Sequence, residues 1–230
     1  MKRTLAVVSA GLRLPSTTRM LADRLADGVR EELEGRGAQV DVDVVEVRDH
    51  AHDLVNHLMA GYPSPRLRRV FGAVTAADGL IVVTPTFTAS YSGLFKMFFD
   101  CLEDTALVDK PVLTAATGGT GRHSLVLDHA VRPMFTYLRA VVVPTAVFAA
   151  TDDWGRGSGD TQDPMVRRIG RSRSETRRRG GPACGAARRG SPRRSRTVRA
   201  SAGGRGVRWA AAGRCRPVPR RARCGPDRKE

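Results

Sequence analysis

The chain has 230 residues, of which 41% are hydrophobic, and a formal net charge of +16. The charge is uneven, because residues 1–155 carry 16 basic and 18 acidic side chains whereas residues 156–230 carry 23 and 5. This distribution excludes a general nucleic-acid-binding role for the whole chain, since the basic excess belongs to its last third. No apolar run approaches the roughly 18 residues of a membrane-spanning helix, so we expect no membrane partner.

Strand and helix patterns alternate from the first residues onward. Residues 5–8 form a short apolar run, which indicates a buried strand rather than a signal peptide because Arg13 interrupts it early. Apolar residues at every fourth position from 21 to 33 predict a helix. The strict alternation at residues 40–44 predicts a strand with one solvent-exposed face, near a sheet edge.

The alternation continues to about residue 155. A helix ending near Ala77 precedes a fully apolar strand at residues 80–83, which we place in the centre of the sheet. Helices are then expected at residues 94–102 and 127–138, and strands at residues 112–116 and 141–148 with a bend at Pro144. Five strands alternating with helices predict an α/β fold with a doubly wound parallel sheet, in the flavodoxin-like order 2-1-3-4-5. Ligands of such sheets bind beyond the carboxyl ends of the strands.

The loop after the first strand has the composition of an anion site. Its candidate binding residues are Ser9, Arg13, Ser16, Thr17 and Thr18. Backbone amides at a helix N-terminus attract anions, and arginine holds a phosphate through two parallel hydrogen bonds. The loop lacks the glycine patterns that bind pyrophosphate, so a terminal monophosphate fits better. The alternative is that Ser16 or Thr17 simply caps the helix.

The loops after the third and fourth strands carry further candidates. They are Pro85, Thr86, Phe87, Thr88 and Tyr91 in the first loop, and Thr117, Gly118, Gly119 and Thr120 in the second. Phe87 and Tyr91 either lie against a flat conjugated ring or pack over the sheet edge, and the pattern leaves both open. The glycines allow a ligand to approach the backbone closely, although a plain turn would also contain them. His123, expected at the start of a helix, is more typical of a capping or packing residue than of an acid or base.

Taken together, the three loops resemble those of the NADPH-dependent FMN reductase family, and the sequence is similar to the actinobacterial members that accompany luciferase-like monooxygenases. The family's phosphate loop, G-S-x-R-x-x-S-x-N/T, is matched by Arg13 and Ser16, with Ser9 near the strand end. Its ring loop, P-x-Y-N-x-S-x-P-G-x-L-K, is matched at Pro85, Ser90, Gly93 and Lys96. Phe87, Thr88 and Ser92 replace the family's Tyr, Asn and second Pro. Residues 117–120 correspond to its glycine-bearing segment, and the resemblance covers residues 1 to about 155.

This resemblance implies a flavodoxin-like reductase domain over residues 1–160 that uses FMN and NADPH. The FMN phosphate would lie in the loop of residues 9–18, and the ring between residues 85–91 and 117–120. NADPH would pass a hydride to flavin N5, and reduced FMN would leave for a partner flavin-dependent monooxygenase or another acceptor. The family implies a homodimer, and we assign no catalytic acid or base and no metal. A flavodoxin-type electron carrier is the alternative, which the nearly neutral charge of residues 1–155 disfavours.

Residues 161–230 form an Arg-, Gly-, Ala- and Pro-rich tail that we expect to be disordered. From residue 156 onward the chain has 22 arginines and one lysine but no Leu, Phe or Tyr, which leaves little to bury. The tail is either an arginine-rich arm that binds nucleic acid, or a reading-frame shift in a GC-rich gene that replaced the last helix and would weaken folding. The scarcity of lysine favours the second interpretation. Cys101 stands alone in the apolar part, which indicates a reducing, cytoplasmic setting.

Overall fold

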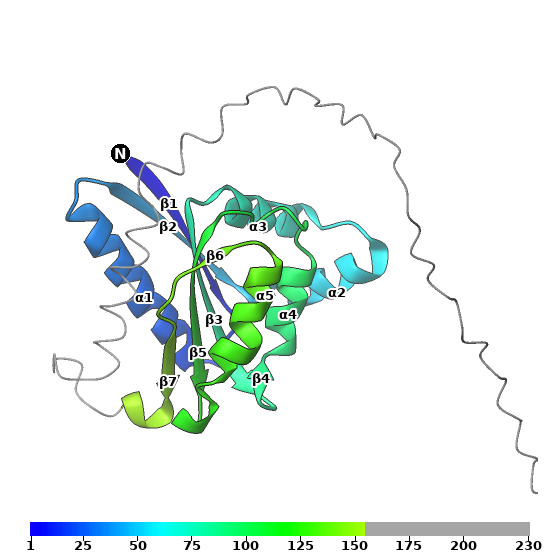
Figure 1. Ribbon diagram of the computed structural model, residues 1–230. Coiled ribbons are helices and arrows are strands. Elements are labelled where there is room, and N and C mark those ends of the chain that lie inside the picture. The colour runs from blue at the N-terminus through cyan, green and yellow to red at the C-terminus, as the bar shows by residue number, and fades with distance from the viewer. Residues whose placement is uncertain (155–230) are drawn as a thin grey trace, which may run out of the picture. The chain divides into compact units, whose positions relative to one another are not determined.

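A parallel sheet with helices on both faces organises the computed structural model, which describes residues 1–154 (Figure 1). The strand order is β2-β1-β3-β5-β6, with β4 beside β3 and β7 beside β5. This confirms the flavodoxin-like order 2-1-3-4-5, with the fifth strand divided into β6 and β7 around Pro144. The expectations about the tail, including its disorder, its nucleic-acid binding and the missing last helix, lie outside the described residues.

The elements follow the predicted alternation closely. The strands are β1 Lys2–Ser9, β2 Gln39–Glu46, β3 Gly79–Phe87, β4 Ser90–Tyr91, β5 Pro111–Gly118, β6 Val141–Val142 and β7 Val147–Ala150. The α-helices are α1 Thr17–Glu34, α2 Ala51–Ala60, α3 Pro65–Ala76, α4 Gly93–Asp100 and α5 Arg132–Tyr137. Short helical turns occur at η1 Val47–His50, η2 Gly121–His123, η3 Leu127–Val131 and η4 Thr151–Trp154. Within residues 1–154, no helix is long and apolar enough to span a membrane.

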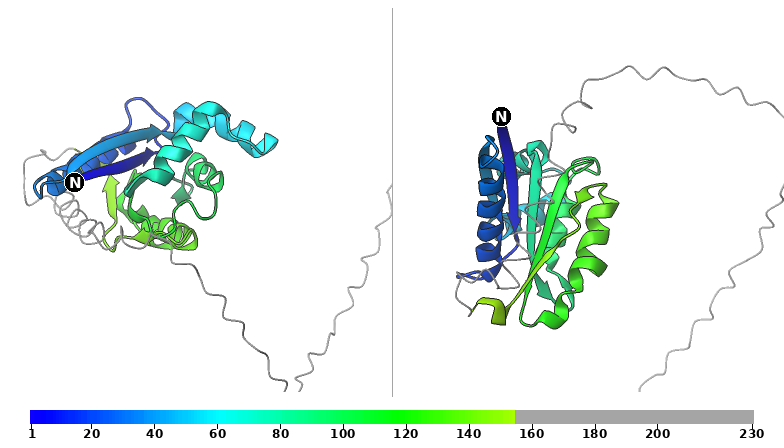
Figure 2. Two further views of the ribbon diagram at one scale, coloured as in Figure 1. Left: turned by 90° about the horizontal axis from the view of Figure 1, so that it is seen from above. Right: turned by 60° about the vertical axis from the view of Figure 1, so that its left-hand side comes forward.

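Two apolar layers enclose the sheet, one on each face. Helix α1 covers one face, where Leu21 and Leu25 belong to the same buried cluster as Val7 of β1. Helices α4 and α5 lie on the opposite face, as the right-hand view of Figure 2 shows. There the rings of Phe95 and Phe135 each stack edge-to-face on the same neighbour, Phe99, with centroids 4.9 Å away. Strands β1 and β3 are buried between these layers because their side chains are apolar on both faces.

Three details differ from the sequence prediction. Helix α2 was missed by the sequence prediction, although Leu54, Val55, Leu58 and Met59 recur along it at helical spacing, and of these four only Leu54 is buried. Strand β4 has two residues, too few for a recognisable pattern. The helix predicted over residues 127–138 begins with the π-helical turn η3, and His123 ends the separate turn η2 rather than starting that helix.

The carboxylate of Asp78 fastens the start of β1 to the loop before β3. It accepts hydrogen bonds from the backbone nitrogen of Thr4 at 2.8 Å, from the Thr4 hydroxyl at 3.1 Å and from Nη1 of Arg3 at 3.1 Å. Burial acts to raise the pKa of Asp78, but the hydrogen bonds from Thr4 and Arg3 outweigh it and lower the pKa below its ordinary value. The ionised carboxylate therefore stabilises the fold.

We predict that Asp78→Asn lowers the free energy of unfolding by roughly 1–2 kcal/mol at neutral pH, because charge-assisted hydrogen bonds to a partly exposed group are lost. The folded-state pKa is the lower one, so this stabilisation is present above the unfolded pKa of about 4 and is lost as pH falls through the folded pKa. Urea unfolding at neutral and acidic pH measures it. A difference between wild type and variant that is equally large at both pH values would contradict the assignment.

The turn between β3 and β4 holds its two central residues in the left-handed region. Thr88 has φ 49° and Ala89 has φ 64°. A two-residue hairpin turn with both φ values positive favours Asn and Gly, and it strains a β-branched residue such as Thr88. The tip of this hairpin therefore stores backbone strain beside the candidate site.

We predict that Ala89→Gly stabilises the fold by about 0.5–1 kcal/mol, because relief of the left-handed backbone exceeds the entropy that glycine adds to the unfolded chain. Ala73→Gly is the matched control, since the same substitution inside α3 should destabilise by about 0.5–1 kcal/mol. Thermal and urea unfolding of both variants test the prediction. Destabilisation by both substitutions would show that the turn is not strained.

Candidate functional site

Three loops meet at the carboxyl edge of the sheet, because the strands that they follow are parallel neighbours. In the sheet register, Ser9 of β1 pairs with Val83 of β3, and Pro85 of β3 pairs with Thr117 of β5. The buried hydroxyls of Thr18 and Thr117 share a hydrogen bond of 2.9 Å, which joins the first turn of α1 to the end of β5. The structure thus brings together segments that lie about a hundred residues apart in the sequence.

The β1–α1 loop, residues 10–16, closes tightly onto the start of α1. The hydroxyl of Ser16 caps the helix by accepting a hydrogen bond from the backbone nitrogen of Arg19 at 3.2 Å. A Cβ at Gly11 would lie 2.0 Å from the Ser16 hydroxyl oxygen, so this position requires glycine. Capping therefore accounts for Ser16, while Thr17 is exposed and Thr18 is buried against β5. The capping alternative explains one of the predicted hydroxyls rather than the whole loop.

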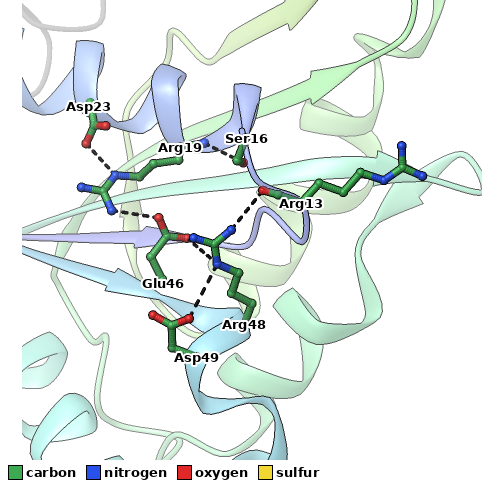
Figure 3. Close-up of polar contacts among 7 residues, drawn as sticks. All are labelled: Arg13, Ser16, Arg19, Asp23, Glu46, Arg48 and Asp49. Atoms are coloured by element: carbon green, nitrogen blue, oxygen red, sulfur yellow. Dashed lines mark hydrogen bonds and ion pairs between the residues drawn. The ribbon is translucent and has the colours of Figure 1, made fainter.

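Two hydroxyl groups at this edge have no hydrogen-bond partner among residues 1–154. The Ser9 hydroxyl is fully buried and makes no hydrogen bond among the described residues, and neither does the Thr86 hydroxyl. An unsatisfied buried polar group costs about 1–3 kcal/mol, so such groups are typical of a site that a ligand completes. Arg13 is exposed, and its side chain extends away from the neighbouring ion pairs (Figure 3). Its guanidinium forms no hydrogen bond or ion pair with another residue of the part of the chain that the structure describes, so it is available to a ligand.

The aromatic residues of the ring loop take different positions. Tyr91 packs inward, with its ring centroid 5.9 Å from that of Phe95 in the core. Phe87 is 46% exposed at the edge of the sheet, next to the exposed Thr88 at the hairpin tip. Each of the two alternatives therefore applies to one residue. Tyr91 packs over the sheet edge, whereas Phe87 has an accessible face that a flat ring could contact.

The loop after β5 begins with a close backbone contact. A Cβ at Gly118 would lie 2.8 Å from Cζ of Phe148 on β7, so the aromatic ring leaves room for glycine alone. Gly119 is exposed, and the Thr120 hydroxyl accepts a hydrogen bond of 3.4 Å from the backbone nitrogen of Arg122. Gly118 is thus explained by packing, whereas Gly119 is exposed at the edge.

A cluster of ion pairs beside the β1–α1 loop was missed by the sequence analysis (Figure 3). Nη1 of Arg19 lies 2.8 Å from Oε1 of Glu46, and Nε lies 2.7 Å from Oδ1 of Asp23. The hydrogen bonds that Arg19 donates to Glu46 and Asp23 raise the pKa of Arg19 above its ordinary value. Arg48, in η1, donates a hydrogen bond from Nη1 to the backbone oxygen of Arg13 at 3.0 Å. The signal that could have found it is the parallel β1–β2 pairing, which sets Glu46 opposite Ser9.

Comparison with known proteins agrees with this geometry. The family model for NADPH-dependent FMN reductase matches residues 3–155. An FMN reductase (NADPH) of Pseudomonas aeruginosa is 40% identical over 64% of this chain and 76% of its own length. An NADH-dependent FMN reductase, SfnF, of Pseudomonas fluorescens is 38% identical over 74% of this chain and 88% of its own.

Solved structures extend the likeness to the fold. An oxidoreductase of Corynebacterium diphtheriae superposes with a TM-score of 0.73 at 45% identity, covering 77% of this chain and 96% of that one. The apo form of an NADH:FMN oxidoreductase, EmoB, gives a TM-score of 0.67 at 26% identity, covering 80% of this chain and 98% of that one. The match of the family model to most of the described residues, together with these relatives, establishes that the chain belongs to the NADPH-dependent FMN reductase family.

Proposed function

We propose that this protein is an NAD(P)H-dependent FMN reductase whose flavin site is the carboxyl edge of the sheet. The observation that carries the proposal is the buried Ser9 hydroxyl at the end of β1, which has no hydrogen-bond partner among residues 1–154. It lies directly before a loop that leads into the N-terminus of α1 and bears the exposed Arg13. A phosphate group would supply acceptors for the hydroxyl, the loop amides and the guanidinium of Arg13. Membership of the reductase family supports the same assignment.

The residues present fit FMN at both of its ends. Ser9, Arg13 and Thr17 would surround the phosphate, while Ser16 shapes the loop as its helix cap and Thr18 holds it to Thr117. The ring would lie between residues 85–91 and 117–120, against the accessible face of Phe87 and the unpartnered Thr86 hydroxyl. FMN, when bound, supplies the hydride-accepting chemistry, and the protein orients it and excludes water.

The nicotinamide donor, the acceptor and the assembly form the remaining parts of the proposal. Relatives carry names that specify NADPH in one case and NADH in another, so both nucleotides are candidate donors. We further propose a homodimer in the reducing cytoplasm that passes reduced FMN to a flavin-dependent monooxygenase or another acceptor. These parts rest on the family resemblance.

We predict that the purified full-length protein oxidises NADPH or NADH at a rate that depends on added FMN. Arg13→Ala should lower kcat/KM for FMN by about tenfold to a hundredfold, because charge-assisted phosphate hydrogen bonds are lost. Arg30→Ala is the matched control, since it removes only a surface pair with Asp27 on α1 and should leave turnover unchanged. The fall in absorbance of the reduced nicotinamide measures the turnover rate of the wild type and of both variants.

The outcomes separate the candidate functions. FMN-dependent turnover that Arg13→Ala lowers to this extent and Arg30→Ala preserves supports the reductase. A folded protein that binds FMN tightly but does not accept hydride from either nucleotide would instead be an electron carrier of the flavodoxin type. A folded protein that neither binds FMN nor oxidises nicotinamide would contradict the proposed function.

A further inference from the structure

We propose that Arg48 is a positioning residue for the FMN phosphate, acting through the backbone of the β1–α1 loop and through the charge of Glu46. Neither the family's loop motifs nor the sequence pattern includes this arginine, which lies in η1 directly after β2. The proposal rests on the proposed function, because it assigns a role toward the phosphate that this loop is proposed to bind.

The first part of the argument is the attachment of the loop. Nη1 of Arg48 donates to the backbone oxygen of Arg13 at 3.0 Å, across 35 residues of sequence. Within residues 1–154, this is the hydrogen bond that ties the backbone of residues 11–15 to the rest of the fold. The Arg48 side chain is 21% exposed, so the contact is partly shielded from water. Arg48 therefore restricts the conformations of the loop.

The second part of the argument is that Arg13 and Arg48 have different roles. Figure 3 shows the Arg13 side chain extending away from the point where Arg48 holds its backbone oxygen. The guanidinium of Arg13 is thus left for a ligand, while Arg48 sets the position from which that side chain starts. A binding group that is held in place before the ligand arrives loses less entropy on binding. Arg48 would raise affinity for the phosphate without touching it.

The third part is electrostatic. Glu46 lies opposite Ser9 in the β1–β2 register, and its side chain is only 10% exposed. An uncompensated carboxylate beside a phosphate site would repel the anion. Two cations flank it instead: Nη1 of Arg19 lies 2.8 Å from Oε1, and Nε of Arg48 lies 3.7 Å from Oε2. The same Nε of Arg48 lies 3.6 Å from Oδ1 of Asp49, and because both distances exceed hydrogen-bond length, Arg48 acts on these two carboxylates by charge alone.

The test compares FMN with riboflavin, which has the same ring system and no phosphate. Equilibrium binding of both flavins to the full-length protein gives the two dissociation constants. We expect Arg48→Ala to raise the Kd of FMN about tenfold and that of riboflavin less than about twofold. The Kd of FMN for Arg48→Lys should lie between those for wild type and Arg48→Ala. Lysine keeps the positive charge, but it lacks the planar guanidinium with which Arg48 donates to the Arg13 backbone oxygen and approaches Glu46 at the same time.

Arg132→Ala is the matched control. Arg132 also donates to backbone oxygens, those of Val143 and Pro144 at 3.1 and 2.8 Å, pairs with Asp128, and has a side chain that is 28% exposed. Its removal should leave the ratio of the two flavin affinities unchanged. Thermal unfolding of each variant checks that the protein is folded. A merely structural role for Arg48 would lower affinity for both flavins together.

A double substitution separates action through the loop from direct contact with the phosphate. If Arg48 acts by positioning Arg13, Arg48→Ala should weaken FMN binding by less than about threefold once Arg13 is already alanine. Independent, additive effects would overturn the assignment, as would an unchanged FMN affinity in Arg48→Ala or equal losses for FMN and riboflavin. Wild-type protein that binds neither flavin would contradict the proposed function itself, whereas wild-type binding that Arg48→Ala leaves unchanged would contradict this inference alone.

Discussion

The parallel pairing of β1 with β3, and of β3 with β5, is the constraint on which the rest of this structure depends. Parallel strands end at the same edge, so the loops after them must converge there. The buried pair Thr18–Thr117 then fixes the spacing between two of these loops. Packing does the remainder: Phe148 leaves room only for glycine at position 118, and the cap on α1 does the same at Gly11.

Charge organises the outer side of the same edge. The β2 strand ends in a partly buried carboxylate, Glu46, which would be unfavourable beside an anion. Arg19 from α1 and Arg48 from η1 flank that carboxylate and join helix, strand and loop in one network. Arg13 stays outside the network, so its charge is available. For ligand binding, the consequence of this ion-pair cluster lies in the shape and electrostatic potential of the loop.

The sheet order and the three loops could be predicted from the sequence. Each buried strand has a continuous run of apolar residues, and the candidate loop follows directly after that run. The Arg48 contact was missed because it depends on the register of β1 against β2, which no local sequence pattern shows. The sequence could not decide between Phe87 and Tyr91, because the two-residue strand β4 turns Tyr91 inward. The burial of helix α2 also goes beyond the sequence pattern, because Leu54 is buried while Val55, Leu58 and Met59, at helical spacing from it, are exposed.

The central claim is that the carboxyl edge of the sheet binds FMN through its phosphate. A crystal structure of the full-length protein grown with FMN tests it most directly. The account predicts the phosphate within hydrogen-bond distance of the Ser9 hydroxyl and the Arg13 guanidinium, with the ring beside Phe87 and Gly119. FMN bound elsewhere, or bound at this edge with its phosphate directed away from the β1–α1 loop, would contradict the account.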